Sequence, residues 1–122
     1  MNHLTEPLFT TAVHGTTDGP LVQAAGELDL DAAPIIDTAL HRALAADPAA
    51  DRLVIDLAGV TFCDSSGLDA LLRARIATAW AGLTLHLARP AHAVAKLLKL
   101  TGADGLFPVD RDVPALPYPH AV

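Results

Sequence analysis

Two kinds of hydrophobic period alternate along this chain. Short segments with a period of two, or with a brief unbroken apolar run, are typical of β-strands. The turn-rich residues 16–20 separate the first two such segments, which predicts a β-hairpin. The strands predicted in this way are residues 8–14, 21–28, 52–60, 83–88 and 105–110.

The segments between the later strands have a helical period instead. In the first of them, Ile36, Leu40 and Leu44 fall on one stripe, and Pro48 ends the pattern. Asp31 is the expected N-cap of this helix, and Pro34 is acceptable in its first turn.

A second helix is expected to begin at Ser65 or Ser66 and to end near Gly82. Its apolar stripe is predicted to consist of Leu68, Leu71, Leu72 and Ile76, and Trp80 near its end is expected to lie partly in the core. Residues 90–102 predict a third helix. The resulting order, β-β-α-β-α-β-α-β, predicts an α/β fold whose sheet is mixed, since the first hairpin is antiparallel.

The composition narrows the classes of function. A chain of 122 residues fits one domain, and its 52% apolar content favours a globular core. The net charge of -6 and the absence of a basic run argue against nucleic-acid binding. A single cysteine excludes an internal disulfide. Neither a signal peptide nor a membrane span is predicted, so we expect a cytoplasmic protein.

The stretch VTFCDSSGLDALL, residues 60–72, concentrates the candidate chemistry. It leads from a strand into a helix, so Ser65 and Ser66 lie where backbone N–H groups lack partners and the helix dipole is positive. One serine can cap the helix, which leaves the second serine, Asp64 and Gly67 unexplained. The strand–turn–helix context suits a nucleophile elbow, but that motif needs glycine two residues away on both sides of the serine, and neither serine has that arrangement. A serine here can also accept a phosphate, whose charge the helix terminus tolerates.

Three pieces of the sequence, in order, resemble the STAS domains of bacterial anti-sigma factor antagonists, in particular the sporulation and general-stress antagonists. Along the chain they are GELDLDAAP at residues 26–34, VIDLAGVTFCDSSGLDALL, and LHLARPAHAVAKLLKLTGADGLFPV. The resemblance spans about residues 8–110. It implies a STAS fold, with a mixed sheet of four to five strands and helices packed on one face. It also implies a single STAS domain over residues 1–112, while the proline-rich residues 113–122 are expected to be a loosely ordered tail.

The resemblance implies partner switching and no enzymatic activity. In this family the unphosphorylated antagonist binds an anti-sigma factor, which is also a GHKL-type serine kinase, and so releases the sigma factor. Phosphorylation switches binding off, and a PP2C-type phosphatase reverses it. The kinase binds the ATP, so we expect no cofactor in this chain.

Position by position, the resemblance assigns the phosphorylated serine to Ser65. Ser66 matches the support or cap position, and Asp64 and Gly67 match the flanks of the motif. Asp29 matches the aspartate of the family's segment that corresponds to GELDLDAAP here. The predicted partner-binding residues around Ser65 are Asp29, Asp64, Ser66, Gly67, Leu68 and Asp69. Asp69 stands where the family often has a small residue. A phosphorylation-independent STAS module, which binds a small ligand or serves a transport or sensory assembly, is the alternative.

Overall fold

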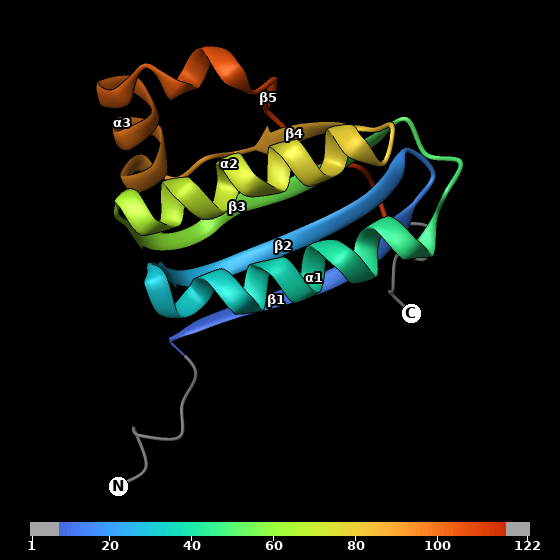
Figure 1. Ribbon diagram of the computed structural model, residues 1–122, viewed down its shortest axis with the longest axis horizontal. Helices are drawn as coiled ribbons and strands as arrows, with labels where there is room; N and C mark the ends of the chain where they lie inside the picture. Colours follow the sequence, from blue (N-terminus) through green and yellow to red (C-terminus); the bar gives the residue numbers. More distant parts are fainter. Residues whose placement is uncertain (1–7, 117–122) are drawn as a thin grey trace, which may run out of the picture.

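The computed structural model describes residues 8–116 of the chain, which fold into one sheet and three α-helices (Figure 1). The strands are β1 (Phe9–Thr16), β2 (Gly19–Leu28), β3 (Arg52–Cys63), β4 (Thr84–Ala88) and β5 (Val109–Asp110). The helices are α1 (Ala33–Ala46), α2 (Ser65–Trp80) and α3 (His92–Thr101), with 3-10 turns η2 (Leu30–Ala32) and η3 (Ala103–Leu106). The predicted element order and α/β class are therefore confirmed.

The sheet has five strands in the order β1-β2-β3-β4-β5. β1 and β2 form the antiparallel hairpin, and every later pair is parallel, so the sheet is mixed as predicted. β3 is the central strand, and its residues 53–57 are all buried, because both faces of the sheet are covered there.

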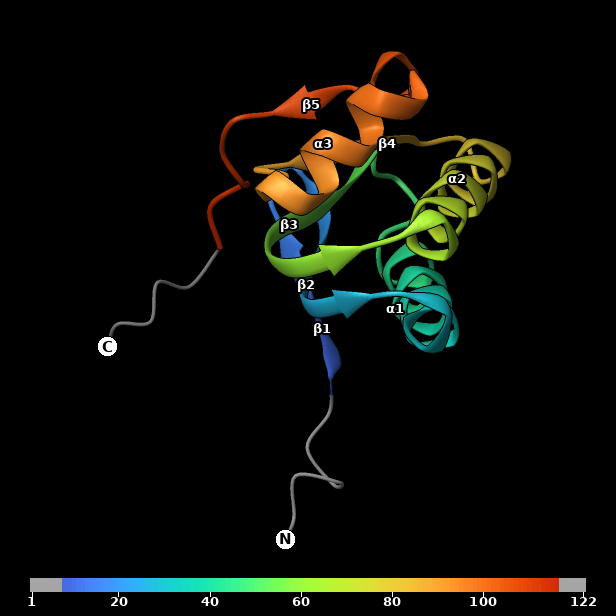
Figure 2. The same cartoon turned by 90° about the vertical axis from the view of Figure 1, so that its left-hand side faces the viewer.

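All three helices contribute buried residues to one core on the same face of the sheet. This core joins Leu53, Ile55 and Leu57 of β3 to the apolar sides of the helices. Figure 2 shows α1 and α2 side by side along that face. The opposite face has a small apolar cluster of Leu21, Val54 and Ala88.

The C-terminal segment covers this second cluster. Val113 packs against it, and Pro114 is buried. Residues 113–116 contain no helix or strand, and residues 117–122 of the expected tail lie outside the described residues. The boundary between domain and tail thus stays a prediction.

Two expectations about helix ends and faces are wrong. Asp31 is not the N-cap of α1, because the 3-10 turn η2 precedes the helix and Asp29 caps that turn. Ile76 and Trp80 are 55% and 87% exposed, so neither belongs to the core. The side of α2 that faces the sheet carries smaller residues, Ala74 and Thr78, which let the helix lie close to the strands.

An ion pair between the buried Asp56 and the exposed Arg89 holds β3 to the segment after β4. Asp56 is only 4% exposed, and its carboxylate accepts hydrogen bonds from Arg89 Nη2 (2.6 Å) and Nε (3.3 Å). Ala58 N (3.0 Å) and Gln23 Nε2 (3.4 Å) donate to the same carboxylate. Burial raises the pKa of Asp56, but the hydrogen bonds from Arg89 and Ala58 outweigh it, so the pKa lies below its usual value.

Gly67 lies in close contact with the end of β2. A Cβ atom there would overlap the carbonyl oxygen of Leu28, and it would lie 2.9 Å from Leu28 Cγ and 3.0 Å from Cys63 Sγ. The absence of a side chain therefore allows the first turn of α2 to rest against the end of β2.

We expect Gly67→Ala to lower the free energy of unfolding by about 1–3 kcal/mol, because overpacking outweighs the better helix propensity of alanine. Denaturant titration measures this change. Gly105→Ala is the matched control, since nothing lies within 4 Å of a Cβ at that position. Equal stabilities of the two variants would contradict the steric explanation.

Asp56 should contribute to the acid sensitivity of the fold. Its pKa is lowered on folding, so its contribution to stability is complete above the unfolded-state pKa of about 4 and is lost as pH falls through the folded-state pKa. Asp56→Asn should therefore flatten the fall of unfolding free energy below about pH 4. Asp104→Asn, at an exposed position, controls for the loss of one charge. An Asp56→Asn curve parallel to wild type would contradict this role.

Candidate functional site

The candidate site lies at the edge of the sheet where β2 and β3 end. Leu28 pairs with Cys63 as the last residues of these parallel strands, and Asp64 N donates to the Leu28 carbonyl (3.4 Å). Because the strands run in the same direction, Asp29 and Asp64 follow them at the same edge. Figure 1 shows that α1 and α2 both begin there.

Asp64 is the N-cap of α2, which corrects the expectation that a serine caps this helix. Asp64 Oδ1 accepts hydrogen bonds from Ser66 N (3.0 Å) and Gly67 N (3.1 Å). A carboxylate satisfies two free N–H groups and also interacts favourably with the helix dipole. Ser66 therefore does not cap α2, although the family resemblance matched it to a support or cap position.

Asp29 makes an equivalent cap at the end of β2. Its Oδ1 accepts from Asp31 N (3.1 Å) and Ala32 N (3.2 Å), which starts the turn η2. The two aspartates thus fix the two neighbouring loops by the same interaction, and α2 packs against η2.

Ser65 is the first residue of α2 and its side chain is exposed, whereas Ser66 is half-buried. Within residues 8–116, neither hydroxyl makes a hydrogen bond to another side chain or backbone group. The histidines of this range that form hydrogen bonds, His14, His41 and His86, do so with other residues. The geometry therefore offers an accessible hydroxyl that forms no hydrogen bond with a histidine of the described residues.

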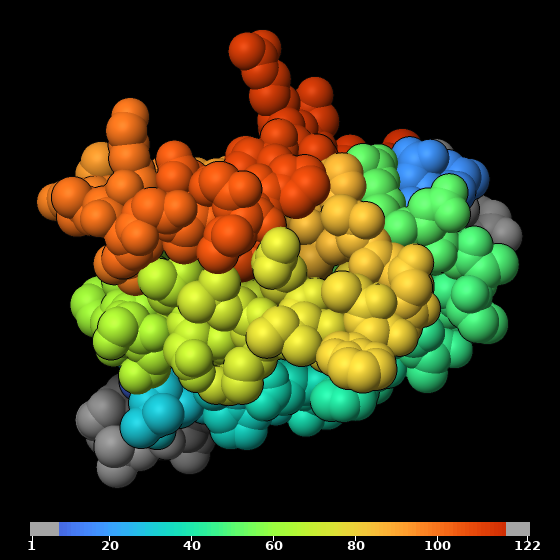
Figure 3. Space-filling view, turned by 45° about the horizontal axis from the view of Figure 1, so that its top comes forward, coloured from blue at the N-terminus to red at the C-terminus, as the bar shows by residue number. Residues whose placement is uncertain are grey.

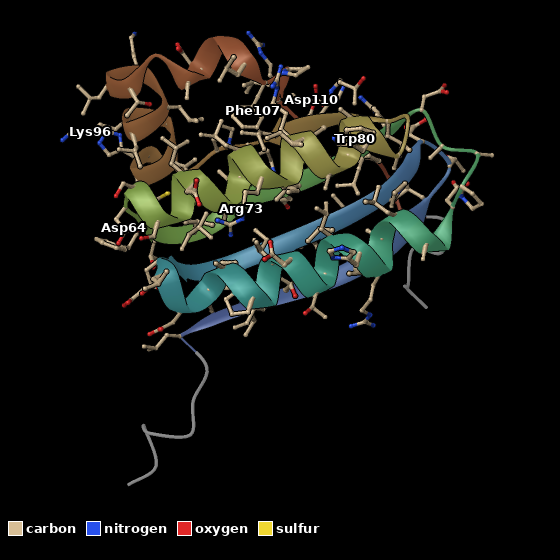
Figure 4. The ribbon with its side chains drawn as sticks, in the orientation of Figure 1. Asp64, Arg73, Trp80, Lys96, Phe107 and Asp110 are labelled. Atoms are coloured by element: carbon tan, nitrogen blue, oxygen red, sulfur yellow. The ribbon has the colours of Figure 1, made fainter. Side chains whose placement is uncertain are left out.

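The other predicted site residues divide into two groups. Gly67 and Leu68 are buried, so they position the turn. Asp69 is exposed and pairs with Arg73 one turn later. Arg73, labelled on α2 in Figure 4, also reaches Asp37 of α1 (3.8 Å). Exposed pairs of this kind contribute little stability.

Cys63 lies directly under this turn and is half-buried. Burial, together with the negative charge of Asp64, raises the pKa of the Cys63 thiol to about 11. The thiol is therefore protonated at neutral pH and is a weak nucleophile.

Sequence reasoning missed a group of exposed apolar side chains at the same edge. Leu30, Ile35 and Phe62 are 70%, 40% and 46% exposed, and Leu8 is 67% exposed. A hollow of about 210 Å³ at this edge is lined by Leu8 and Ile35 of this group, together with Glu27, Asp29 and Asp31. The sequence signal for this exposed apolar group was Leu30, which lies between two aspartates. An isolated leucine in an acidic loop has no core position to occupy.

The described residues show neither a metal cluster nor a membrane helix. In residues 8–116 no three His, Cys, Asp or Glu side chains are grouped so that they could hold a metal ion. In the same range no helix is long and apolar enough to cross a membrane.

Solved structures with the same fold include regulators and a transporter. An anti-sigma factor antagonist from Mycobacterium paratuberculosis is 28% identical, with a TM-score of 0.69 over 86% of this chain and 87% of that one. The anti-sigma factor antagonist SpoIIAA in its unphosphorylated form is 24% identical, with a TM-score of 0.58 over 84% and 90%. The murine Solute Carrier 26 family member A9 anion transporter is 15% identical, with a TM-score of 0.69 over 86% of this chain but only 21% of the transporter. The last two likenesses show the fold alone.

Among curated proteins, none matches this chain. The family model described as "Mlab, STAS domain" matches residues 11–108, which include all three helices, β2 to β4 and most of β1, but not β5. This match and the shared fold confirm the resemblance noted in the three sequence motifs. The chain belongs to the STAS domain family.

Proposed function

We propose that this chain is an anti-sigma factor antagonist that is controlled by phosphorylation on Ser65. The unphosphorylated form binds an anti-sigma factor that is also a GHKL-type serine kinase, and so releases the sigma factor. A PP2C-type phosphatase restores the phosphorylated form to the binding state. The chain acts by binding and not by catalysis, and the proposal places it in the cytoplasm, where the kinase finds ATP.

The exposed Ser65 hydroxyl at the first position of α2 carries the proposal. It is accessible to a kinase, and Asp64 rather than Ser65 performs the structural work of capping the helix. Modification of Ser65 thus removes no hydrogen bond that the fold uses. The 28% identical antagonist from Mycobacterium paratuberculosis supports the same class of function.

The surroundings of Ser65 suit a partner surface that is both apolar and basic. Leu30, Ile35 and Phe62 offer exposed apolar area, and the neighbouring acidic groups Glu27, Asp29 and Asp31 lie within the same edge. Apolar contact surrounded by charges is typical of specific protein interfaces. We therefore place the anti-sigma factor over the ends of β2 and β3.

A phosphate on Ser65 would oppose this contact for two reasons. It adds close to two negative charges beside the Asp64 carboxylate, which already occupies the N–H groups of Ser66 and Gly67. The phosphate therefore remains hydrated at the surface, and apolar contact with the partner would have to remove that water. The fold itself needs no rearrangement.

A STAS module without a phosphorylation switch is the second candidate. The likeness to the domain of the murine anion transporter favours it, because there the fold is part of a transport protein. In that case the chain would bind a small ligand or serve as a subunit of a transport or sensory assembly, and Ser65 would have no regulatory role.

The first test is phosphorylation by each GHKL-type kinase of the host with ATP. We expect one kinase to add one phosphate to Ser65, because this hydroxyl is exposed, and we expect Ser65→Ala to abolish it. Intact mass and site-localising fragmentation measure the product. Ser66→Ala is the control and should retain phosphorylation and stability, since Ser66 does not cap α2. Folded protein that no kinase modifies would favour the module without a switch.

The second test separates charge from shape at the same position. We expect Ser65→Asp to weaken binding to the cognate anti-sigma factor by about tenfold or more, a loss of at least about 1.4 kcal/mol. Ser65→Asn has nearly the same shape without the charge and should bind much more tightly than Ser65→Asp. Aspartate at the start of a helix is favourable, so the stability of Ser65→Asp should not fall. Calorimetric titration gives the affinities, and equal binding by the two variants would show that charge is not the switch.

A further inference from the structure

A second hollow lies at the end of α2 that is remote from Ser65. It measures about 610 Å³, and its walls are α2 and the segment before β5, with β4 as its floor. Figure 3 shows these two surfaces side by side, α2 in yellow and residues 102–110 in orange. The lining of the hollow includes Arg75, Ile76, Trp80, Leu83, Leu85 and Leu106.

The rim of this hollow is unusually apolar for an exposed surface. Trp80 is 87% exposed, Ile76 55% and Leu106 44%, and all three line the same hollow. Leu83 and Leu85 below them are buried and belong to the core. A contiguous apolar surface with an exposed tryptophan is characteristic of sites where another molecule binds.

The charge of the hollow favours a partner that carries an acidic group. Arg75 is the one charged residue of the lining, in a chain whose net charge is -6. Its Nε donates to the Leu106 carbonyl (2.8 Å), which fixes the guanidinium beside the apolar rim. Within residues 8–116 its two terminal nitrogens have no acidic partner. They are therefore free to bind a carboxylate in a bidentate manner.

We propose that this hollow, which we name the Trp80 groove, docks a segment of a partner protein that combines apolar side chains with a carboxylate. The carboxylate binds Arg75, and apolar side chains lie between Trp80 and Leu106. A second copy joined through the same groove is disfavoured, because a symmetric contact would bring two Arg75 side chains together.

The Trp80 groove is a site separate from the Ser65 edge. The two lie at opposite ends of α2, whose 16 residues span roughly 24 Å. Figure 4 shows Asp64 and Trp80 at these opposite ends. Partners at the two sites can therefore bind at the same time, and this inference does not depend on phosphorylation of Ser65.

Selection from a displayed library of random 12-residue peptides tests the proposal, with the whole chain as target and Trp80→Ser for counter-selection. We expect enriched peptides to combine Asp or Glu with aliphatic or aromatic residues. Trp80 is the single tryptophan of the chain, so its fluorescence reports binding directly. The best synthetic peptide should shift the emission to shorter wavelength as Trp80 leaves water.

Matched variants identify the contacts. Arg75→Ala should lower the affinity for the peptide by about tenfold. Replacing the acidic residue of the peptide with Gln should lower it by a similar factor. Arg42→Ala, which removes an exposed arginine outside the groove, and Ser65→Asp should leave the affinity unchanged. Circular dichroism verifies that each variant is folded.

Three results would overturn the proposal. The first is a selection that yields no peptide able to shift the emission of Trp80. The second is enrichment of basic peptides, or equal affinity for the Gln peptide. The third is a concentration-dependent shift without peptide, together with a dimer in sedimentation, which would assign the groove to a second copy of this chain.

Discussion

The parallel pairing of Leu28 with Cys63 is the constraint on which the rest of the site depends. It brings the ends of β2 and β3 to one edge, so the two loops that follow are neighbours. Gly67 then permits α2 to rest against the Leu28 carbonyl, because no Cβ atom intervenes. Asp29 and Asp64 fix the two loops by equivalent caps. Ser65 is exposed beside these contacts, and its side chain takes part in none of them.

This division of tasks shows why a phosphate on Ser65, as proposed above, would not disturb the fold. The groups that stabilise the turn are the Asp64 carboxylate and the backbone of Ser66 and Gly67. Ser65 contributes only its backbone to α2, so its side chain is free to vary. Cys63, beneath the turn, is protonated and half-buried, and it adds packing without a competing reactive group.

Changes of hydrophobic period predicted the element order, because strands and helices differ in period wherever one face is buried. The location of the site followed from the motif at residues 64–67 and from Asp29. The N-cap residue of α2 and the side of α2 that faces the sheet could not be predicted, because in each case neighbouring residues compete for the same position. Asp64 and Ser65 both suit an N-cap, and only the backbone geometry shows that the carboxylate reaches two N–H groups. Ile76 suggested a stripe of large residues, whereas close packing on β4 requires the smaller Ala74 and Thr78.

The difference between the expected and the observed buried side of α2 also accounts for the Trp80 groove. Once Ala74 and Thr78 face the sheet, Ile76 and Trp80 must turn outward, where they border the Trp80 groove. α2 thus carries the exposed Ser65 hydroxyl at its start and an apolar, cationic surface at its end. Leu71, Ala74 and Thr78 anchor the helix in the core between these ends. A phosphate on Ser65 therefore has no packing route by which to alter the groove, unless α2 slides, and the contact of Gly67 with Leu28 opposes sliding. The two surfaces should accordingly act as independent sites on one rigid helix.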